Sequence, residues 1–179
     1  MKEGYRFCPM CATPLQWLAR EEDGGAKERL RCAACEWTHW NNPTPVLAAV
    51  VEMADRDGAI LLARNAAWSG RMFALITGFM EAGETPQEGI AREVKEETST
   101  EVESVSLIGV YDFQRMNQVI VAYHVVARGE IRLSPELAEY KLFAPQDVRC
   151  WPAGTGYALA DWLRSRGHDP QFIELPPRP

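Results

Sequence analysis

The segment 78–100 constrains this chain more than any other part of its sequence. It joins a glycine-rich loop to a short, helix-forming run that is dense in glutamate. Thr85 is placed as a helix N-cap, Pro86 suits the first helical position and Glu88 completes a capping box with Thr85. Eight of the chain's 25 acidic residues lie between positions 81 and 103. Because such carboxylates repel one another, the segment predicts a short helix whose acidic cluster binds a cation.

The helical period sorts the residues of this run onto two faces. Ile90 and Val94 lie one turn apart and are expected to face a core. Glu93, Glu96 and Glu97 fall within an arc of about 100°, given about 3.6 residues per turn. Oxygen ligands in this number suit Mg²⁺ or Mn²⁺ better than zinc. The alternative is a solvated acidic face paired with neighbouring basic residues.

The spacing of one glycine, four glutamates and one arginine favours the metal site over the solvated face. The pattern runs Gly78, five residues, Glu84, seven residues, and then Arg92-Glu93-Val94-x-Glu96-Glu97. This pattern resembles the Nudix box. The resemblance implies a loop–helix–loop that holds divalent metal and hydrolyses nucleoside diphosphates linked to another moiety. It also implies the fold, which is a Nudix-type α/β/α sandwich with a mixed sheet.

The box departs from the family pattern at its end. Ser99 stands where the family usually has glycine, and Thr100 stands where it has an aliphatic residue. Both positions follow the glutamates, so they bear on the C-cap of the helix rather than on the chemistry. The left-handed backbone conformation costs a serine more free energy than a glycine.

Four of the five cysteines form two Cys-x-x-Cys knuckles. Cys8 and Cys11 make the first, and Cys32 and Cys35 make the second, with 20 residues between them. Each pair can supply two thiolates from one tight turn, so the spacing predicts a tetrahedral, structural Zn²⁺ site. Two disulfides or a redox pair would also fit the spacing, and a reducing cytosol disfavours disulfides. Cys150 is left over and is expected to be a packed thiol.

We expect the chain to divide into three parts: a zinc ribbon over 1–42, a domain that resembles the Nudix hydrolases over 43–170 and an extended tail over 171–179. Its 179 residues suffice for one medium domain with a small appendage. The sequence has no run of 18 apolar residues and no apolar signal core at its start. We therefore expect a cytoplasmic protein with no membrane partner. A net charge of −6 argues against bulk electrostatic binding to nucleic acid.

Apolar runs on both sides of the acidic helix predict a mixed α/β architecture. The predicted strands cover 46–53, 59–63, 105–112, 119–127 and 142–144, and residues 73–77 lead into the glutamate motif. A C-terminal helix is expected over 155–166, with Gly167 as its stop. Strands before and after the acidic helix, together with this last helix, indicate a sandwich around a mixed sheet.

A zinc ribbon in front of a Nudix box resembles the NADH pyrophosphatase branch and its relatives that act on ADP-ribose, FAD or similar compounds. Within that resemblance, Phe79 matches an aromatic residue that stacks on a base, and Glu139 matches a further metal-binding glutamate. Tyr111 and Phe113 are further candidates for stacking on the substrate. The Ser-Gln-Pro-Trp-type array of that branch is missing, and only Gln118 and the apolar strand after it are comparable. The resemblance therefore implies a small nucleotide substrate without identifying it.

The expected mechanism is metal-assisted attack of water on a pyrophosphate phosphorus. The expected metal-binding groups are Glu93, Glu96, Glu97, Glu139 and the backbone carbonyl of Thr77 or Gly78. Glu139 is expected either as a ligand or as the base that orients the water. Arg92 is expected to brace a neighbouring carboxylate rather than to contact phosphate.

Two other function classes fit parts of the sequence. The chain could be a nucleic-acid-binding regulator whose pocket senses a nucleotide, although the acidic balance and the complete glutamate set count against this. It could also be a housecleaning pyrophosphatase for nucleoside triphosphates, because the same metal motif serves that reaction. Trp17, Trp37 and Trp40 exceed what so small a ribbon can bury, so we expect a homodimer that uses this surface.

Overall fold

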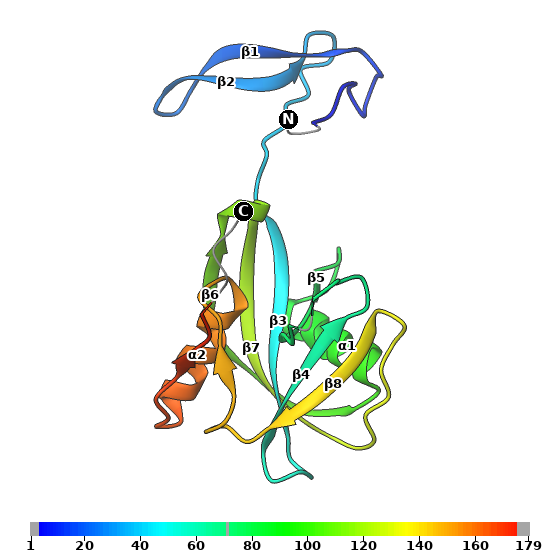
Figure 1. Ribbon diagram of the computed structural model, residues 1–179. Coiled ribbons are helices and arrows are strands. Elements are labelled where there is room, and N and C mark those ends of the chain that lie inside the picture. The colour runs from blue at the N-terminus through cyan, green and yellow to red at the C-terminus, as the bar shows by residue number, and fades with distance from the viewer. Residues whose placement is uncertain (1–3, 71, 175–179) are drawn as a thin grey trace. The chain divides into compact units, whose positions relative to one another are not determined.

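The computed structural model describes residues 4–70 and 72–174. The chain divides between Asn42 and Pro43 into two compact units, which Figure 1 shows as ribbons. The smaller unit carries both cysteine knuckles, and the larger unit carries the glutamate-rich helix. Each unit is built on its own sheet.

The smaller unit is an antiparallel hairpin flanked by the two cysteine knuckles. Strand β1 (Leu15–Glu22) pairs with strand β2 (Gly25–Cys32) along its whole length. The hairpin returns the chain to its starting point, so the two knuckles meet. All four cysteines are free thiols, and their Sγ atoms lie within 4.8 Å of one another. The structure therefore has a thiol tetrad at this place, and not two disulfides.

A mixed sheet forms the centre of the larger unit. Its strands are β3 (Thr44–Met53), β4 (Ala59–Asn65), β5 (Ile76–Phe79), β6 (Glu101–Phe113), β7 (Gln118–Arg128) and β8 (Leu137–Phe143). They follow the order β6-β7-β3-β4-β8, with β3 and β7 parallel and the other pairs antiparallel. The first half of β3 pairs with β5, and its second half pairs with β4. Strands β5 and β4 therefore both lie on the same edge of β3 and separate from each other near its middle, as Figure 1 shows.

Successive side chains of β3 point to opposite sides of the sheet, and each side packs against one helix. Leu47 and Val51 join an apolar cluster with Ile90 of α1 (Pro86–Thr98). Val50 joins a second cluster with Leu159 of α2 (Thr155–Ser165). We call these two sides the α1 face and the α2 face. The predicted α/β/α sandwich around a mixed sheet is confirmed.

The helices of the larger unit are short. Helix α1 has 13 residues and α2 has 11, and a single 3-10 turn, η1 (Gln114–Met116), joins β6 to β7. Gly154 precedes α2 with φ 48°, and a Cβ atom there would lie 3.3 Å from the side chain of Ile120. Across the described residues, no helix combines the length and the apolar composition that a membrane crossing requires.

Helix α1 begins as its sequence predicts. The Glu88 N–H donates to the Thr85 hydroxyl, and the Glu88 carboxylate accepts from the Thr85 N–H at 2.8 Å. The helix ends at Thr98, and Ser99 takes the left-handed conformation with φ 59°. Thr100 is buried at the usual aliphatic position, and its hydroxyl bonds to that of Thr98 at 2.7 Å. The helix therefore ends on a residue in the left-handed conformation, although that residue is serine and not glycine.

Two C-terminal segments differ from the sequence-based expectation. Strand β8 begins at Leu137, whereas the sequence predicts a strand only over 142–144, because this exposed edge strand alternates polar residues and lacks an apolar run. In the segment expected as a tail, β10 (Gln171–Phe172) pairs in parallel with β9 (Arg149–Cys150). Residues 175–179 of that tail lie outside the described residues.

Replacing Ser99 by glycine is expected to raise the free energy of unfolding by about 1 kcal/mol, because a residue with a Cβ atom pays roughly that much for the left-handed conformation. Urea denaturation of the variant and the parent measures the difference. Ser99→Ala is the matched control, since it removes the hydroxyl but keeps the strained backbone, and it should not stabilise. Equal stabilisation by both variants would contradict the backbone explanation.

Candidate active site

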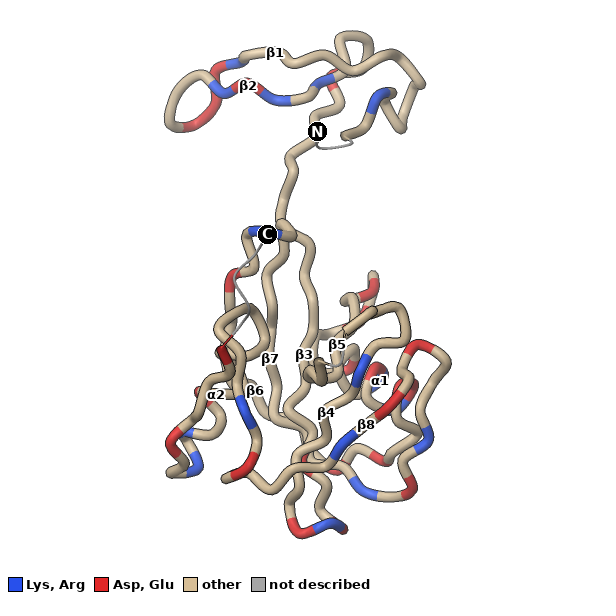
Figure 2. The backbone as a smooth tube through the Cα atoms, viewed as in Figure 1, with Lys and Arg blue, Asp and Glu red and all other residues tan. Residues whose placement is uncertain are grey.

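Four glutamates line one cavity beside the second half of α1. Glu93, Glu96 and Glu97 come from the helix, and Glu136 comes from the loop before β8. The cavity has a volume of about 250 Å³, and Ser134 belongs to its wall. Figure 2 shows the acidic residues gathered along α1. The structure thus brings together the three helical glutamates of the sequence motif and adds a carboxylate from a distant segment.

Arg92 holds the acidic loop and the acidic helix together. Its guanidinium lies 3.0 Å from a carboxylate oxygen of Glu84, 2.9 Å from one of Glu93 and 3.0 Å from one of Glu96. The same group donates to the backbone carbonyl of Phe79 at 3.3 Å. The Arg92 hydrogen bonds hold the pKa of Glu84 below its usual range. The contacts match the bracing role expected for Arg92, which links the loop before the helix to two carboxylates of the helix.

Glu97 is the buried member of the cluster. Only 8% of its surface is exposed, and burial raises the pKa of its carboxyl to about 7, with a further contribution from Glu93, Glu136 and Glu96. Burial also raises the pKa of Glu93, although Arg92 opposes that shift. Among the residues that the structure describes, no basic side chain forms an ion pair with Glu97 or Glu136. This part of the cluster has negative charge without a cationic partner from the chain.

The fourth carboxylate is Glu136 and not Glu139. Glu139 pairs with Arg64 across β8 and β4, beside Leu62 and Lys141 in the same register. Leu62 packs on the α2 face, and directly paired residues point to the same side of a sheet, so Glu139 points to the α2 face. The cluster lies on the α1 side, because Ile90 and Val94 of the same helix pack there. This corrects the placement drawn from the sequence, which did not extend β8 far enough to reveal the alternation of its side chains.

The loop that carries Glu136 is tied to the end of α1 by backbone hydrogen bonds. The Ser134 N–H donates to the Glu97 carbonyl at 3.0 Å, and the Arg132 N–H donates to the Thr98 carbonyl at 2.9 Å. These carbonyls have no partner within the helix because the helix ends here. The helix terminus therefore fixes the position of Glu136 relative to Glu97.

Gly78 allows the helix carboxylates to approach the β5 backbone. A Cβ atom at Gly78 would clash with the carboxylate of Glu93, so no other residue fits without moving that group. The backbone of β5 at Gly78, which is one of the two carbonyls expected to bind metal, therefore lies close to the carboxylate of Glu93. Gly89 plays a similar part on the helix, where a Cβ atom would lie 2.5 Å from the Glu84 carboxylate.

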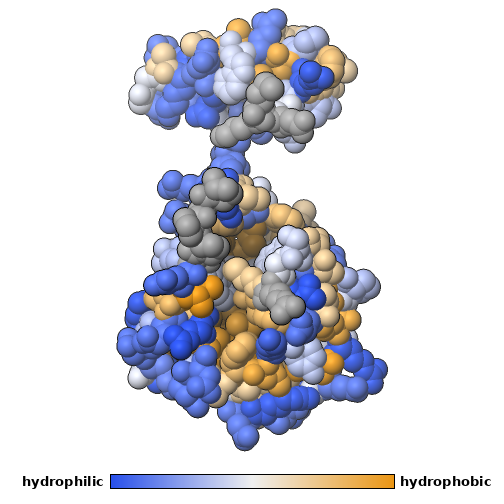
Figure 3. Space-filling view, in the orientation of Figure 1, coloured by the Kyte–Doolittle hydropathy of each residue, from blue (hydrophilic) through white to orange (hydrophobic). Residues whose placement is uncertain are grey.

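The residues expected to bind the rest of the substrate gather on the α2 face. Phe79 lies opposite Val46, Val46 lies opposite Ile120, and Ile120 lies opposite Tyr111, so these four point to one side of the sheet. Val46, Ile120 and Tyr111 all belong to the cluster that packs on α2. Phe79 is 60% exposed at the end of this row. Figure 3 shows apolar residues over the middle of the larger unit.

Phe113 and Gln118 form the next pair on the same face of these strands, two residues beyond Tyr111 and Ile120. Phe113 packs against the α2-face cluster, and the Arg115 guanidinium lies 5.4 Å from its ring centre. The Tyr111 hydroxyl donates to Asp161 of α2 at 2.9 Å, so its polar end is already used within the fold. Phe79 is thus the predicted aromatic residue that is most free to stack on a ligand, and Tyr111 mainly joins β6 to α2.

The acidic cluster fits a divalent metal of the Mg²⁺ or Mn²⁺ type. It offers four carboxylates and no thiol or imidazole, which is the ligand set that such ions take. Its buried carboxylate, Glu97, has no basic partner among the described residues, and a bound metal would supply a cation. The thiol tetrad of the smaller unit fits Zn²⁺, because four sulfur atoms within 4.8 Å can complete a closed tetrahedral site.

Comparison with known families agrees with this geometry. The NUDIX domain family matches residues 43–163, and the family described as Nudix N-terminal, a zinc ribbon, matches residues 6–41. A NAD-capped RNA hydrolase NudC of Pseudomonas putida is 28% identical over 156 residues, which cover 86% of this chain and 53% of that protein. The NudC of Mycobacterium tuberculosis is 34% identical over 120 residues, which cover 65% of this chain and 36% of that protein. The chain spans about half the length, or less, of these curated relatives.

Solved structures give the same assignment. A Nudix hydrolase from Nitrosomonas europaea superposes with a TM-score of 0.75 and 27% identity, covering 94% of this chain and 97% of that one. An ADP-ribose pyrophosphatase from Streptococcus suis shares the fold at a TM-score of 0.52 and 19% identity, covering 74% of this chain and all of that one (100%). With its glutamate helix, its α/β/α sandwich and its cysteine tetrad, the chain belongs to the Nudix hydrolase family and carries an N-terminal zinc ribbon.

Proposed function

We propose that this protein is a metal-dependent pyrophosphohydrolase that cleaves the diphosphate of a nucleotide linked to another moiety. The observation that carries the proposal is the cavity in which Glu93, Glu96, Glu97 and Glu136 meet. The proposed substrate class includes NADH, ADP-ribose, FAD and related dinucleotides or nucleoside diphosphate sugars. The Nudix relatives support the reaction class, and the substrate within that class is our proposal.

We assign the metal-binding role to Glu93, Glu96, Glu97 and Glu136, with a β5 carbonyl at Thr77 or Gly78. A divalent metal bound there would neutralise diphosphate oxygens and lower the pKa of a coordinated water. Glu136 is exposed and tied through its loop to the end of α1, so it suits a group that orients the attacking water. Arg92 positions Glu84, Glu93 and Glu96 and is itself no substrate ligand.

We assign Phe79 to stacking on a base or ring. It occupies the end of β5, one residue after Gly78, where an added Cβ atom would clash with the carboxylate of Glu93. Neighbouring strand residues point to opposite faces, so β5 can present a diphosphate to the glutamates and a ring to Phe79. Phe113 and Gln118 lie farther along the same face and could line the ring site.

NAD-capped RNA is a second candidate substrate, because the relatives from Pseudomonas putida and Mycobacterium tuberculosis are named for it. The net charge of −6 gives the chain no broad attraction for a polynucleotide. Recognition of an RNA substrate would therefore depend on the cap itself. Housecleaning of nucleoside triphosphates and nucleotide sensing by a regulator are the two competing functions, and the products of the reaction separate them.

The first test is hydrolysis of NADH, NAD⁺, ADP-ribose, FAD, NAD-capped RNA and nucleoside triphosphates in Mg²⁺ or Mn²⁺, with identification of the products. We expect two phosphate monoesters from a dinucleotide or sugar substrate. Glu97→Gln should lower kcat by about 10²-fold or more. Release of pyrophosphate from triphosphates would favour the housecleaning reaction, and no turnover of any compound would favour the regulator.

Glu136→Gln should abolish most of the rise in Tm that Mg²⁺ or Mn²⁺ gives the parent, because it removes a carboxylate from the metal cavity. Glu139→Gln is the matched control from the same segment, and its metal-induced rise in Tm should equal that of the parent. Differential scanning fluorimetry with and without metal measures both. A loss in Glu139→Gln together with a normal response in Glu136→Gln would reverse the assignment.

We propose that the ribbon binds a structural Zn²⁺ through Cys8, Cys11, Cys32 and Cys35, and free thiols of this kind suit a cytoplasmic setting.

We also propose a homodimer that uses the ribbon surface. Trp17 is 65% exposed and Trp40 is 55% exposed, although Trp37 is stacked on His39 inside the ribbon. Analytical ultracentrifugation should give about twice the chain mass of 20.1 kDa. A mass of one chain at micromolar concentration would contradict the dimer.

A further inference from the structure

The thiol tetrad of the ribbon is divided into a buried pair and an exposed pair. Cys8 is 3% exposed and Cys32 is 0% exposed, whereas Cys11 and Cys35 are both exposed. Each Cys-x-x-Cys knuckle contributes one cysteine to each pair, so every pair joins the two knuckles. We call Cys8 and Cys32 the inner pair, and Cys11 and Cys35 the outer pair.

Two similar turns place the outer pair at the surface. Cys11 precedes Ala12 and Cys35 precedes Glu36, and both of the following residues take the left-handed conformation, with φ 58° and φ 61°. The outer cysteines therefore occupy equivalent positions in the two turns. Cys32, by contrast, is the last residue of β2 and is paired with β1. The backbone thus sets which half of the tetrad solvent can reach.

The outer sulfur atoms are close enough to be joined. The Cys11 and Cys35 Sγ atoms lie 3.5 Å apart, although 24 positions separate the two residues in the sequence. A disulfide has an S–S distance of about 2.0 Å, so a small shift of two exposed side chains would bring the atoms together. Cysteines that bind zinc are thiolates, and exposed thiolates are the form of cysteine that oxidants attack. The outer pair therefore combines access, proximity and a reactive form.

The fifth cysteine lacks this combination. Cys150 is 0% exposed within the α2-face cluster, and burial raises the pKa of its thiol to about 11. It is therefore a protonated and inaccessible thiol at neutral pH, which reacts slowly. An oxidant that meets the chain should react at the outer pair before it reacts at Cys150.

We propose that the outer pair is an oxidation site, at which a peroxide joins Cys11 to Cys35 and the ribbon loses its Zn²⁺. The inference rests on the Zn²⁺ site proposed above. One thiolate attacks a peroxide oxygen, and the O–O bond breaks to leave a sulfenic acid and hydroxide. The other thiolate then attacks the sulfenic sulfur, forms the S–S bond and displaces a second hydroxide. The two sulfur atoms lose two electrons, and hydrogen peroxide gains them and ends as water after taking protons from the solvent.

Formation of the disulfide removes half of the metal ligands. The inner pair offers only two sulfur atoms, whereas a structural Zn²⁺ site of this kind uses all four. The disulfide joins the two knuckles in place of the metal, so the ends of the β1–β2 hairpin stay together. Thiol reductants reverse the bond, because a thiolate can attack either of its sulfur atoms. The ribbon therefore acts as a reversible redox switch on its own metal binding.

The test is release of zinc from the full chain during titration with hydrogen peroxide, followed with a chromogenic zinc chelator. We expect about one Zn²⁺ per chain to be released as a disulfide between Cys11 and Cys35 appears in peptide maps by mass spectrometry. Dithiothreitol followed by Zn²⁺ should restore the metal content. Neither readout depends on hydrolysis, so the result separates this inference from the proposed reaction.

Cys35→His keeps four ligands, because three cysteines and one histidine form a common structural zinc set, but it removes the disulfide partner of Cys11. The variant should bind zinc like the parent and release it at least about tenfold more slowly in peroxide, since no second exposed thiolate is within reach. Cys150→Ala is the matched control. It removes a buried thiol outside the tetrad and should release zinc at the rate of the parent.

The peptide maps and the variants can each contradict the inference. A disulfide within either knuckle, or zinc release from Cys35→His at the rate of the parent, would overturn the outer pair as the site. Zinc that stays bound in excess peroxide would overturn the switch. Untreated protein that contains no zinc would refute the Zn²⁺ assignment on which the inference rests.

Discussion

The Arg92 guanidinium is the interaction on which the candidate site depends. It contacts carboxylates of Glu84, Glu93 and Glu96 at 2.9–3.0 Å, so one positive charge holds the loop before α1 against the helix. Without it, three carboxylates from two segments would repel each other at close range. Glu97 lies outside this network and is buried, which raises the pKa of its carboxyl to about 7. Arg92 thus pairs with one part of the acidic cluster, and among the described residues no basic side chain forms an ion pair with Glu97.

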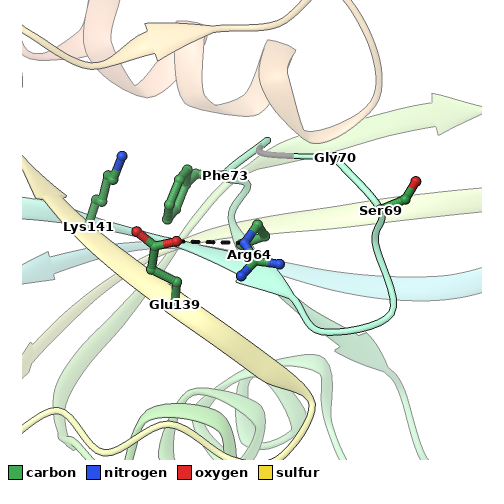
Figure 4. A pocket seen from close by; sticks show the side chains of 6 residues that line it. All are labelled: Arg64, Ser69, Gly70, Phe73, Glu139 and Lys141. Carbon is green, nitrogen blue, oxygen red and sulfur yellow. Dashed lines mark ion pairs between the residues drawn. The ribbon is translucent and has the colours of Figure 1, made fainter.

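Strand β5 connects the two halves of the proposed chemistry. Its residue Gly78 lies against Glu93 on the side of α1, and the next residue, Phe79, points to the α2 face. Because successive side chains of a strand point to opposite faces, the residues next to the acidic cluster and on the proposed ring-binding face are neighbours in the sequence. The point at which β5 and β4 separate along the edge of β3 lies beside β5. Strands β4 and β8 lie side by side (Figure 1), and residues of both line the cavity shown in Figure 4.

The end of α1 shows how a departure from the family pattern is absorbed. Ser99 adopts the left-handed conformation that glycine takes at lower cost, and Thr100 is buried with its hydroxyl bonded to Thr98. The carbonyls of Glu97 and Thr98 then accept backbone hydrogen bonds from the loop that carries Glu136. The helix end therefore keeps its function of positioning this loop, although two of its residues differ.

The sequence by itself determined the local features whose period or spacing is short. The capping box of Thr85 and Glu88, the grouping of Glu93, Glu96 and Glu97, and the cysteine spacing all follow from geometry within a few residues, and the family pattern supplied the fold. The tertiary structure decided which distant side chains meet. It alone selected Glu136 over Glu139, because an exposed edge strand has no apolar run to fix its register in advance. It alone gathered Arg64, Phe73 and Lys141 into one cavity, since pairing between β4 and β8 is set by the whole sheet and not by either strand.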